Sequence, residues 1–406
     1  MKKILTLISF YDIIIGVIIC TYKGVRHINK KEIAEIKKQF TPANCAITRI
    51  CGCYVNGEKE KQSTFKQAFL SLPEEEMFKY FDIFRKGLSG TLGKNLINMD
   101  FSLEAELNGG THEFLLKLRE SRLTDDMLLN TFYDKIIESY DYAEHYLILL
   151  IHSAYDIPGK SSDNEEMFDA SDEVYDYIVC SICPVKLSKP GLSYDAELNT
   201  FHDRIRDWIV EMPNHAFLFP AFNDRSTDIH STLYYSKKPE ELHMELVDSL
   251  LGCSSPLTAG TQKESFNTLI TETLGDECSY EVVKNIHENL NELIEEQKDS
   301  PVPVELDKEE VKYLFAKSGV DQEKLENFDT QYETVAGEKS TLLATNITNT
   351  RTFEIKTPDI IIKVNPERTD LVETKVIDGR QCLVIGVDDY VEINGISART
   401  ILKKSE

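Results

Sequence analysis

The sequence is poor in the residues that mark small secreted or fibrous proteins. Its 406 residues contain nine cysteines, thirteen prolines, nineteen glycines and a single tryptophan. Nine cysteines are too few for a disulfide framework, and an odd number suits reduced thiols. No internal repeat or low-complexity tract is present. With 41% hydrophobic residues, the composition is that of a globular chain long enough for two or three domains.

Positive charge is also scarce. Lysine and arginine number 45 against 69 aspartates and glutamates, which gives a net charge of −24. Such a surface repels nucleic acid and anionic lipid at long range, so any polyanion must bind locally. The exception is the stretch 29–66, where four glutamates face eight cations: Lys30, Lys31, Lys37, Lys38, Arg49, Lys59, Lys61 and Lys66.

The sequence has one long hydrophobic run, from Ile4 to Cys20, and two lysines precede it. It is shorter than the roughly 20 residues of a spanning helix, contains Asp12, and precedes no small-residue cleavage site. Two interpretations remain. Residues 1–27 are either a non-native leader, translated from DNA upstream of a start at Ile28, or a weak N-terminal anchor. Unless residues 4–20 are a real anchor, no membrane contact is expected.

Hydrophobic patterning predicts an α+β fold, with a mixed sheet covered by helices, then a helical segment and a small C-terminal β unit. The expected domains are 28–238, 239–340 and 341–406. Asn29, Ser71 and Thr124 mark the starts of three helices, and Asn56-Gly57 indicates a hairpin.

Several apolar runs of strand length suggest that helices cover both faces of the sheet. They are "HYLILLIHSAYDI", "EVYDYIVCSICPVKLS", "RIRDWIVEMP", "AFLFPAFN" and "IHSTLYYSK". The acidic segment "GKSSDNEEMFDASDE" between the first two is expected to be an exposed loop. After Pro239 the pattern becomes helical, with a capping box at Asp307 and Glu310 and a last helix over 321–336. Hairpin turns are expected at Asp378-Gly379 and Asn394-Gly395.

The spacing Cys180-x-x-Cys183 raises the question of a metal site. It lies within an apolar strand, where successive side chains alternate faces, and no second such pair completes a four-cysteine site. Core packing is the preferred interpretation, so no metal or other cofactor is predicted.

The best candidate site is "FPAFNDRSTDIHSTLYY", in which Asp224, Arg225, Asp228 and His230 crowd one connection. Arg225 has the geometry to bind a phosphate or carboxylate, and Asp228 to orient His230 as a base. The competing interpretation is structural: Asn223 and Asp224 cap a turn, and Arg225 pairs with a carboxylate. No nucleophile or glycine-rich phosphate loop accompanies the cluster, so the structural interpretation is favoured.

Two groups of motifs carry a resemblance to known families. "NKKEIAEIKKQFTPANCAITRICGCYV", "SLPEEEMFKYFDIFRK", "SICPVKLSKPGLSY", "FLFPAFNDRSTDIHSTLYYSK" and "NPERTDLVETKVIDGRQCLVI" resemble a bacterial family of unknown function seen mainly in clostridial genomes. The order of elements over 256–396 is similar to the C-terminal half of NdpA-type nucleoid-associated proteins. That likeness implies chromosome association and carries over no catalytic residue.

Two functions are therefore weighed. The first is a cytoplasmic protein at or near the nucleoid, either monomeric or dimeric. It would contact DNA or a nucleoid protein through Lys30, Lys31, Lys37, Lys38 and Arg49. The alternative, weighed equally, is that the lysines of this group bind nothing and only solvate the exposed face of a helix. The second is a hydrolase or phosphate-handling enzyme at Asp224 to His230.

Overall fold

The computed structural model describes residues 27–160, 166–254, 256–338, 340–387 and 390–398. The chain divides into two compact units, the first ending at Pro256 and the second beginning at Leu257. The apolar run 4–20 lies outside the described residues, and so does all but the last residue of the expected leader or anchor. Among the described helices, none combines the length and apolarity needed to cross a bilayer.

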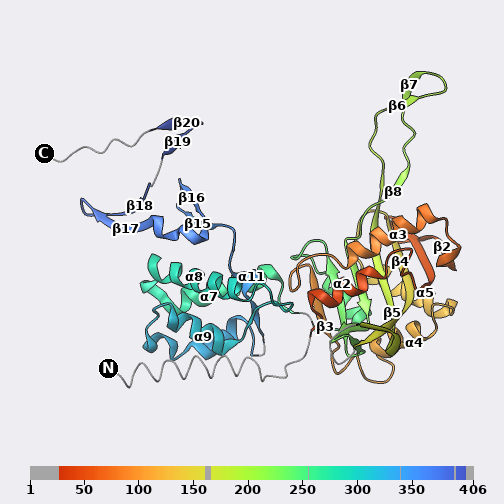
Figure 1. Ribbon diagram of the computed structural model, residues 1–406, viewed down its shortest axis with the longest axis horizontal. Helices are drawn as coiled ribbons and strands as arrows, with labels where there is room; N and C mark the ends of the chain where they lie inside the picture. The colour runs from red at the N-terminus through yellow and green to blue at the C-terminus, as the bar shows by residue number, and fades with distance from the viewer. Residues whose placement is uncertain (1–26, 161–165, 255, 339, 388–389, 399–406) are drawn as a thin grey trace. The chain divides into compact units, whose positions relative to one another are not determined.

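The first unit is built on one large sheet, and the α+β class is confirmed (Figure 1). Every pairing along its path is antiparallel, where a mixed sheet was expected. The runs that are apolar on both faces suggested a sheet covered by helices, and helices do cover both faces of this antiparallel sheet. The strands in spatial order are β2 (Lys61–Ala68), β1 (Ile47–Val55), β4 (Tyr146–Lys160), β5 (Glu166–Leu187), β9 (His215–Phe219), β12 (Ser231–Ser236) and β3 (Leu96–Asp100).

Strand alternation divides the first unit into two hydrophobic layers. Along β4, Leu149 and Ile151 enter one cluster, whereas Ile148 and Leu150 enter the other. Helices α2 (Lys30–Lys38) and α3 (Glu74–Gly87) cover the first layer. Helices α4 (Thr111–Glu120), α5 (Asp126–Ser139) and α6 (Met244–Leu246), with a π-helical turn Val247–Leu251, cover the second. Residues 239–256, expected to open the helical segment, thus pack in the first unit.

The cysteines of the C-x-x-C spacing pack in different layers. Cys180 belongs to the cluster under α4 and α5, and Cys183 to the cluster under α2 and α3. A single ion therefore cannot reach both thiols, and within the described ranges no group of three or more metal-ligating side chains occurs.

Helix starts and turns mostly follow the local signals. Asn29 caps α2 in a capping box with Glu32, but Ser71 caps no helix, because α3 begins after Pro73. The hairpin after β1 uses a longer turn than Asn56-Gly57 alone, with Lys59 in the left-handed region. Helix α4 was missed because the glycines before it suggested a loop.

One expectation about a loop is wrong, and one about a strand is confirmed in part. The acidic segment after β4 was expected to be a loop, but β5 already begins at Glu166. The run "RIRDWIVEMP" was expected in the sheet, and Trp208–Val210 joins it as β8, which pairs with the end of β5, whereas the four residues before it form no strand. Between β5 and β8 the chain leaves the sheet as a ribbon that ends in β6 (Leu192–Asp195) and β7 (Thr200–Asp203) (Figure 1).

The second unit has its own core, formed mainly by α7 (Ala259–Leu274), α8 (Tyr280–Glu296), α9 (Lys308–Lys317) and α10 (Phe328–Val335). The capping box at Asp307 and Glu310 is confirmed, whereas the helix expected over 321–336 is broken into a 3₁₀ turn, Gln322–Leu325, and α10. A short β13 (Glu305–Leu306) pairs with β14 (Leu342–Leu343), and α11 (Ala344–Ile347) follows.

The C-terminal part of the second unit consists of hairpins. They are β15 (Phe353–Lys356) with β16 (Ile361–Val364), β17 (Val372–Ile377) with β18 (Arg380–Ile385), and β19 (Val391–Ile393) with β20 (Ile396–Ala398). The turns at Asp378-Gly379 and Asn394-Gly395 are confirmed, and each has two positive-φ residues.

Candidate functional site

The expected cluster around Arg225 sits on a tight hairpin of the first unit. Strand β10 (Ala221–Asn223) pairs with β11 (Ser226–Asp228), and Asp224 and Arg225 form the turn between them. Both turn residues have φ of 54°, the left-handed conformation of a two-residue hairpin turn. A side chain such as arginine adopts this region at some cost, so contacts elsewhere must hold the turn.

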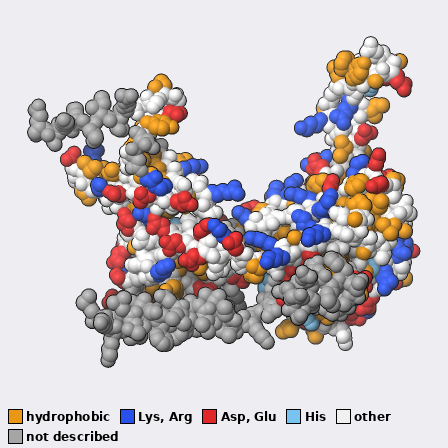
Figure 2. All heavy atoms as spheres, viewed as in Figure 1, with side chains coloured by type: hydrophobic (Ala, Val, Ile, Leu, Met, Phe, Trp, Pro, Cys, Tyr) orange, Lys and Arg blue, Asp and Glu red, His pale blue; other side chains and the backbone are white. Residues whose placement is uncertain are grey.

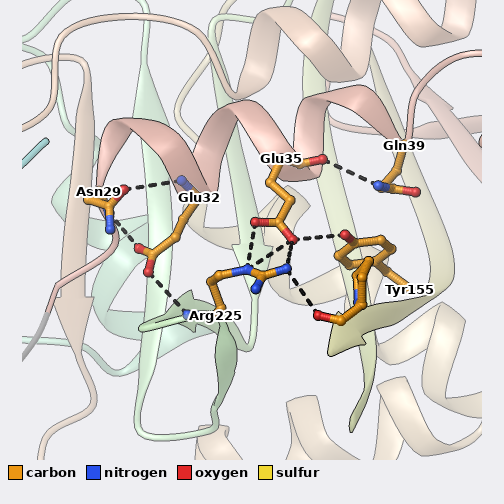
Figure 3. Close-up of polar contacts among 7 residues, drawn as sticks. Asn29, Glu32, Glu35, Gln39, Tyr155 and Arg225 are labelled. Atoms are coloured by element: carbon orange, nitrogen blue, oxygen red, sulfur yellow. Dashed lines mark hydrogen bonds and ion pairs between the residues drawn. The ribbon is translucent and has the colours of Figure 1, made fainter. Parts of the chain in front are cut away.

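The side chain of Arg225 is held by helix α2 (Figure 3). Its Nε lies 3.0 Å from Glu35 Oε2, and its Nη2 lies 2.8 Å from Glu35 Oε1. Tyr155 on β4 donates a hydrogen bond of 2.8 Å to the same carboxylate. Each partner of the ion pair is only 18% exposed. The guanidinium is thus neutralised inside the fold, as the structural interpretation expected.

Glu32 makes the second tie between α2 and the turn. One carboxylate oxygen accepts from the Asn29 amide at 2.8 Å, and the other accepts from the Arg225 amide at 3.1 Å. Burial raises the pKa of Glu32, although the two backbone donors oppose that effect. Because Glu32 and Glu35 are three residues apart, they lie on one face of α2 and clamp the turn together.

A cleft of about 650 Å³ lies beside this clamp. Carboxylates outnumber cations in its wall, and Arg225 is already paired with Glu35, so the cleft is poorly suited to an anion. It is lined by Asn29, Lys31, Glu32, Glu35, Lys38, Ile157, Pro158, Glu173, Asp224 and Arg225.

Asp228 and His230 belong to a different environment. Asp228 accepts hydrogen bonds from Asn223 at 2.6 Å and Ser231 at 2.9 Å, and it bonds only the backbone amide of His230. The His230 ring instead contacts Glu106, with 2.7 Å between Nδ1 and Oε1. That hydrogen bond is the main reason why the pKa of His230 is raised. The expected orientation of His230 by Asp228 is therefore wrong.

The four candidate residues consequently do not converge on one reaction centre. Arg225 is tied to α2, while His230 lies at the surface beside Glu106, a residue that sequence reasoning missed. Glu106 is 124 positions away in the chain, and no local motif connects it to His230.

The cations of the N-terminal region are also divided by the fold. Arg49 donates from its guanidinium to the carbonyl of Arg122, in the connection between α4 and α5, at 3.0 Å. On β1 it alternates with Ile50, which packs under α2 and α3, so Arg49 lies on the opposite face of the sheet from the α2 lysines. It does not belong to one basic surface with them.

A different group of cations gathers where the C-terminal ends of α2 and α3 meet. Phe40 and Phe84 pack with ring centroids 6.0 Å apart, and Lys37 donates a hydrogen bond of 2.6 Å to Ser89. Burial, followed by the charges of Arg85 and Lys86, lowers the pKa of Lys37. We call Lys37, Lys38, Arg85 and Lys86 the cationic edge; Figure 2 shows Lys and Arg side chains gathered on this side of the first unit.

Among the described residues, the lysines of the cationic edge have no acidic partner in an ion pair. No carboxylate of the described residues forms an ion pair with Lys37, Lys38 or Lys86, whereas Arg85 pairs with Asp82 at 2.7 Å. Lys30 and Lys31, at the other end of α2, are exposed as well. Sequence reasoning missed Arg85 and Lys86, although their place in the last turn of a predicted helix was the available signal.

Fold and site together define an α+β protein with an antiparallel sheet between helices, a structural arginine clamp and a separate cationic edge. A family model matches residues 28–396, and the chain belongs to that family, described as a domain of unknown function (DUF4317). No curated protein matches the chain.

Proposed function

We propose that this protein is a nucleic-acid-binding protein that contacts phosphates through the cationic edge. One observation carries the proposal: Arg85 and Lys86 lie close enough to Lys37 to lower its pKa, Lys38 follows it in the last turn of α2, and the three lysines form no ion pair with the described carboxylates. The chain as a whole is strongly acidic, so a local group of cations stands out against its net charge of −24.

The physical case begins with the mutual repulsion of these cations. Lys37 is half-buried beside two other positive groups, which disfavours its charged form. An anion placed among them would relieve that repulsion, because the negative ends of the two helix dipoles that meet there offset only part of the positive charge. Phosphates along a nucleic acid strand supply repeated negative charge to several cations at once.

Binding through so few cations is expected to be independent of sequence. Lysine and arginine contacts to phosphates position a protein without reading bases. The similarity in element order between residues 256–396 and NdpA-type nucleoid-associated proteins supports chromosomal nucleic acid as the ligand. A cytoplasmic location at the nucleoid follows from the proposal.

A hydrolase at His230 is the weaker alternative. A general base works best when it is unprotonated near the working pH. The hydrogen bond that the His230 ring donates to Glu106 raises the pKa of His230. His230 lies 68% exposed at the surface and Arg225 is occupied by Glu35, so the candidate residues do not form one reaction centre.

The test compares two variants with equal loss of charge. The first carries Lys37→Gln, Lys38→Gln, Arg85→Gln and Lys86→Gln. The control carries Lys59→Gln, Lys61→Gln, Lys117→Gln and Lys135→Gln, none of which belongs to the cationic edge. Fluorescence anisotropy with labelled duplex and single-stranded DNA at low salt measures binding, and circular dichroism checks folding.

We expect the first variant to lose affinity by roughly tenfold or more, while the control stays within about threefold of the unmodified protein. Equal losses in both variants would contradict the proposal, because net charge rather than the cationic edge would then govern binding. Absence of binding by the folded, unmodified chain would contradict it outright.

A further inference from the structure

The ribbon between β5 and β8 was not predicted from the sequence. We call residues 188–207 the arm. Leu187 pairs with Trp208, and Leu192 pairs with Asp203 in the same register. Backbone hydrogen bonds from Ser188 to Asp207 and from Arg204 to Gly191 join these segments. The arm is therefore one continuous antiparallel ribbon that extends beyond the sheet (Figure 1).

The end of the arm has an apolar face and a polar face. Tyr194 and Phe201 are cross-strand partners with ring centroids 5.3 Å apart. Alternation places Leu192 and its cross-strand partner Asp203 on the same face as this pair, and Ile205 follows two residues beyond Asp203. The opposite face carries the pairs Ser193 with His202 and Asp195 with Thr200.

The apolar face is open to solvent. Leu192 is 74% exposed, Tyr194 55%, Phe201 67% and Ile205 80%. Figure 2 shows hydrophobic side chains along the arm and at its end. A two-stranded ribbon alone is only marginally stable in water, and among the described strands β6 and β7 pair with no third strand. A surface that covers the apolar face would stabilise the arm.

Charge is distributed unevenly along the arm. The distal part, residues 192–203, carries Asp195, Glu197 and Asp203 and no lysine or arginine. The part near the sheet, residues 188–191 and 204–207, carries three cations and one carboxylate: Lys189, Arg204, Arg206 and Asp207. Two arms that run in opposite directions would place the acidic distal part of each arm near the positively charged part of the other arm, next to its sheet.

We propose that the arm binds the arm of a second copy of this chain, apolar face against apolar face and in opposite directions. A second copy supplies both an equal apolar face and the complementary charges. Tyr194 and Phe201 expose 55% and 67% of their surface, which leaves roughly 80–170 Å² for each to bury. The four apolar side chains thus supply roughly half of the ~800 Å² per partner of a stable interface, and the other residues of the arm supply the rest.

Nucleic acid and anionic membranes fit the arm less well, because its distal end carries only negative charge. The inference stands apart from the proposed function, since none of its residues belongs to the cationic edge. Failure of one proposal therefore leaves the other intact.

The first test measures the oligomeric state. Sedimentation velocity over a range of concentrations should show a dimer for the unmodified full chain. The variant Leu192→Asp with Ile205→Asp should dissociate roughly a hundredfold more readily, because two charges enter an apolar interface. The control Ser193→Asp with Thr200→Asp adds the same charge to the polar face and should remain dimeric.

The second test uses charge reversal to detect opposed arms. One variant carries Glu197→Lys and Asp203→Lys, and the other carries Lys189→Glu and Arg204→Glu. Each alone should dimerise more weakly than the unmodified chain, because like charges meet at both ends. An equimolar mixture should recover dimers, because in a mixed dimer the distal part of each arm meets a sheet-side part of opposite charge on the other arm.

Several results would overturn the inference. These are a monomeric unmodified chain at all concentrations, equal dimerisation of the apolar-face variant and its control, or a mixture that stays monomeric. Binding of the unmodified monomer to anionic vesicles through Leu192 and Ile205 would assign the arm to a membrane instead. Unchanged circular dichroism confirms that each variant is folded.

Discussion

Two charged clusters meet on helix α2, and they differ in how their charge is balanced. On one face, Glu32 and Glu35 hold the backbone and side chain of Arg225, with the ion pair mostly shielded from solvent. At the C-terminal end of the helix, the cationic edge gathers positive charge that the described carboxylates leave largely unpaired. Charge neutralised within the fold stabilises structure, whereas charge left unbalanced is available to a ligand. The comparison therefore assigns stability to Arg225 and binding to the cationic edge.

The largest expected effect on stability comes from Arg225→Ala. Removal of the guanidinium leaves Glu35 shielded without its ion-pair partner, which should cost about 2–3 kcal/mol of unfolding free energy. The matched control is Arg85→Ala, which breaks the exposed pair with Asp82 and should cost about 0.5 kcal/mol or less. Urea unfolding of both variants measures the difference, and similar losses would refute the contrast.

A smaller effect concerns the pH dependence of stability. His215 is buried beside Tyr234, Tyr140 and His243, and burial lowers its pKa to about 3, with a smaller contribution from His243. An unfolded histidine titrates near 6.5, so His215 contributes stability above that pH and loses it as the pH falls toward 3. The loss should reach about 2 kcal/mol by pH 5.

The substitution His215→Gln should flatten this acid-side slope, as measured by urea unfolding between pH 7.5 and 5. His230→Gln provides the surface contrast. The pKa of His230 is raised, so its contribution is present below about 6.5 and is lost as the pH rises through the raised value. Exposure should keep that contribution small. An unchanged slope in His215→Gln would contradict the assignment.

The smallest effect concerns Lys37. Its pKa is lowered, so it loses its charge at a less alkaline pH than an ordinary lysine. Nucleic acid binding should therefore weaken slightly as the pH is raised from neutral toward 9.5. Lys37→Arg keeps its charge over that range and should bind with less dependence on pH. Anisotropy titrations at both pH values provide the measurement, and identical pH dependence in both proteins would count against a role for Lys37.

Local patterns predicted many individual elements but little of the site. The N-cap of α2 at Asn29, the capping box of α9 and the hairpin turns near the C-terminus involve residues at most a few positions apart, so the sequence identifies them directly. The contact between Glu35 and Arg225 joins residues 190 positions apart. Its existence depends on the docking of α2 near β10, which no local spacing encodes.

The arm shows a second limit. "RIRDWIVEMP" has the apolar content of a sheet strand, and that content predicted a place in the sheet. Apolarity indicates that a surface is suited to burial but does not reveal whether the partner lies within the same chain. Arg204, Arg206 and Asp207, together with Pro190-Gly191, were signals that the segment leaves the core.

The most direct test of the central claim is the salt dependence of nucleic acid binding. With about four phosphate contacts, the logarithm of the association constant against the logarithm of salt concentration should slope at roughly −3 to −4 for duplex DNA. The variant with glutamine at Lys37, Lys38, Arg85 and Lys86 should show no measurable binding over the same range, while Arg225→Ala should keep the slope. A folded, unmodified chain that binds no DNA at low salt, or a glutamine variant with an unchanged slope, would contradict the account.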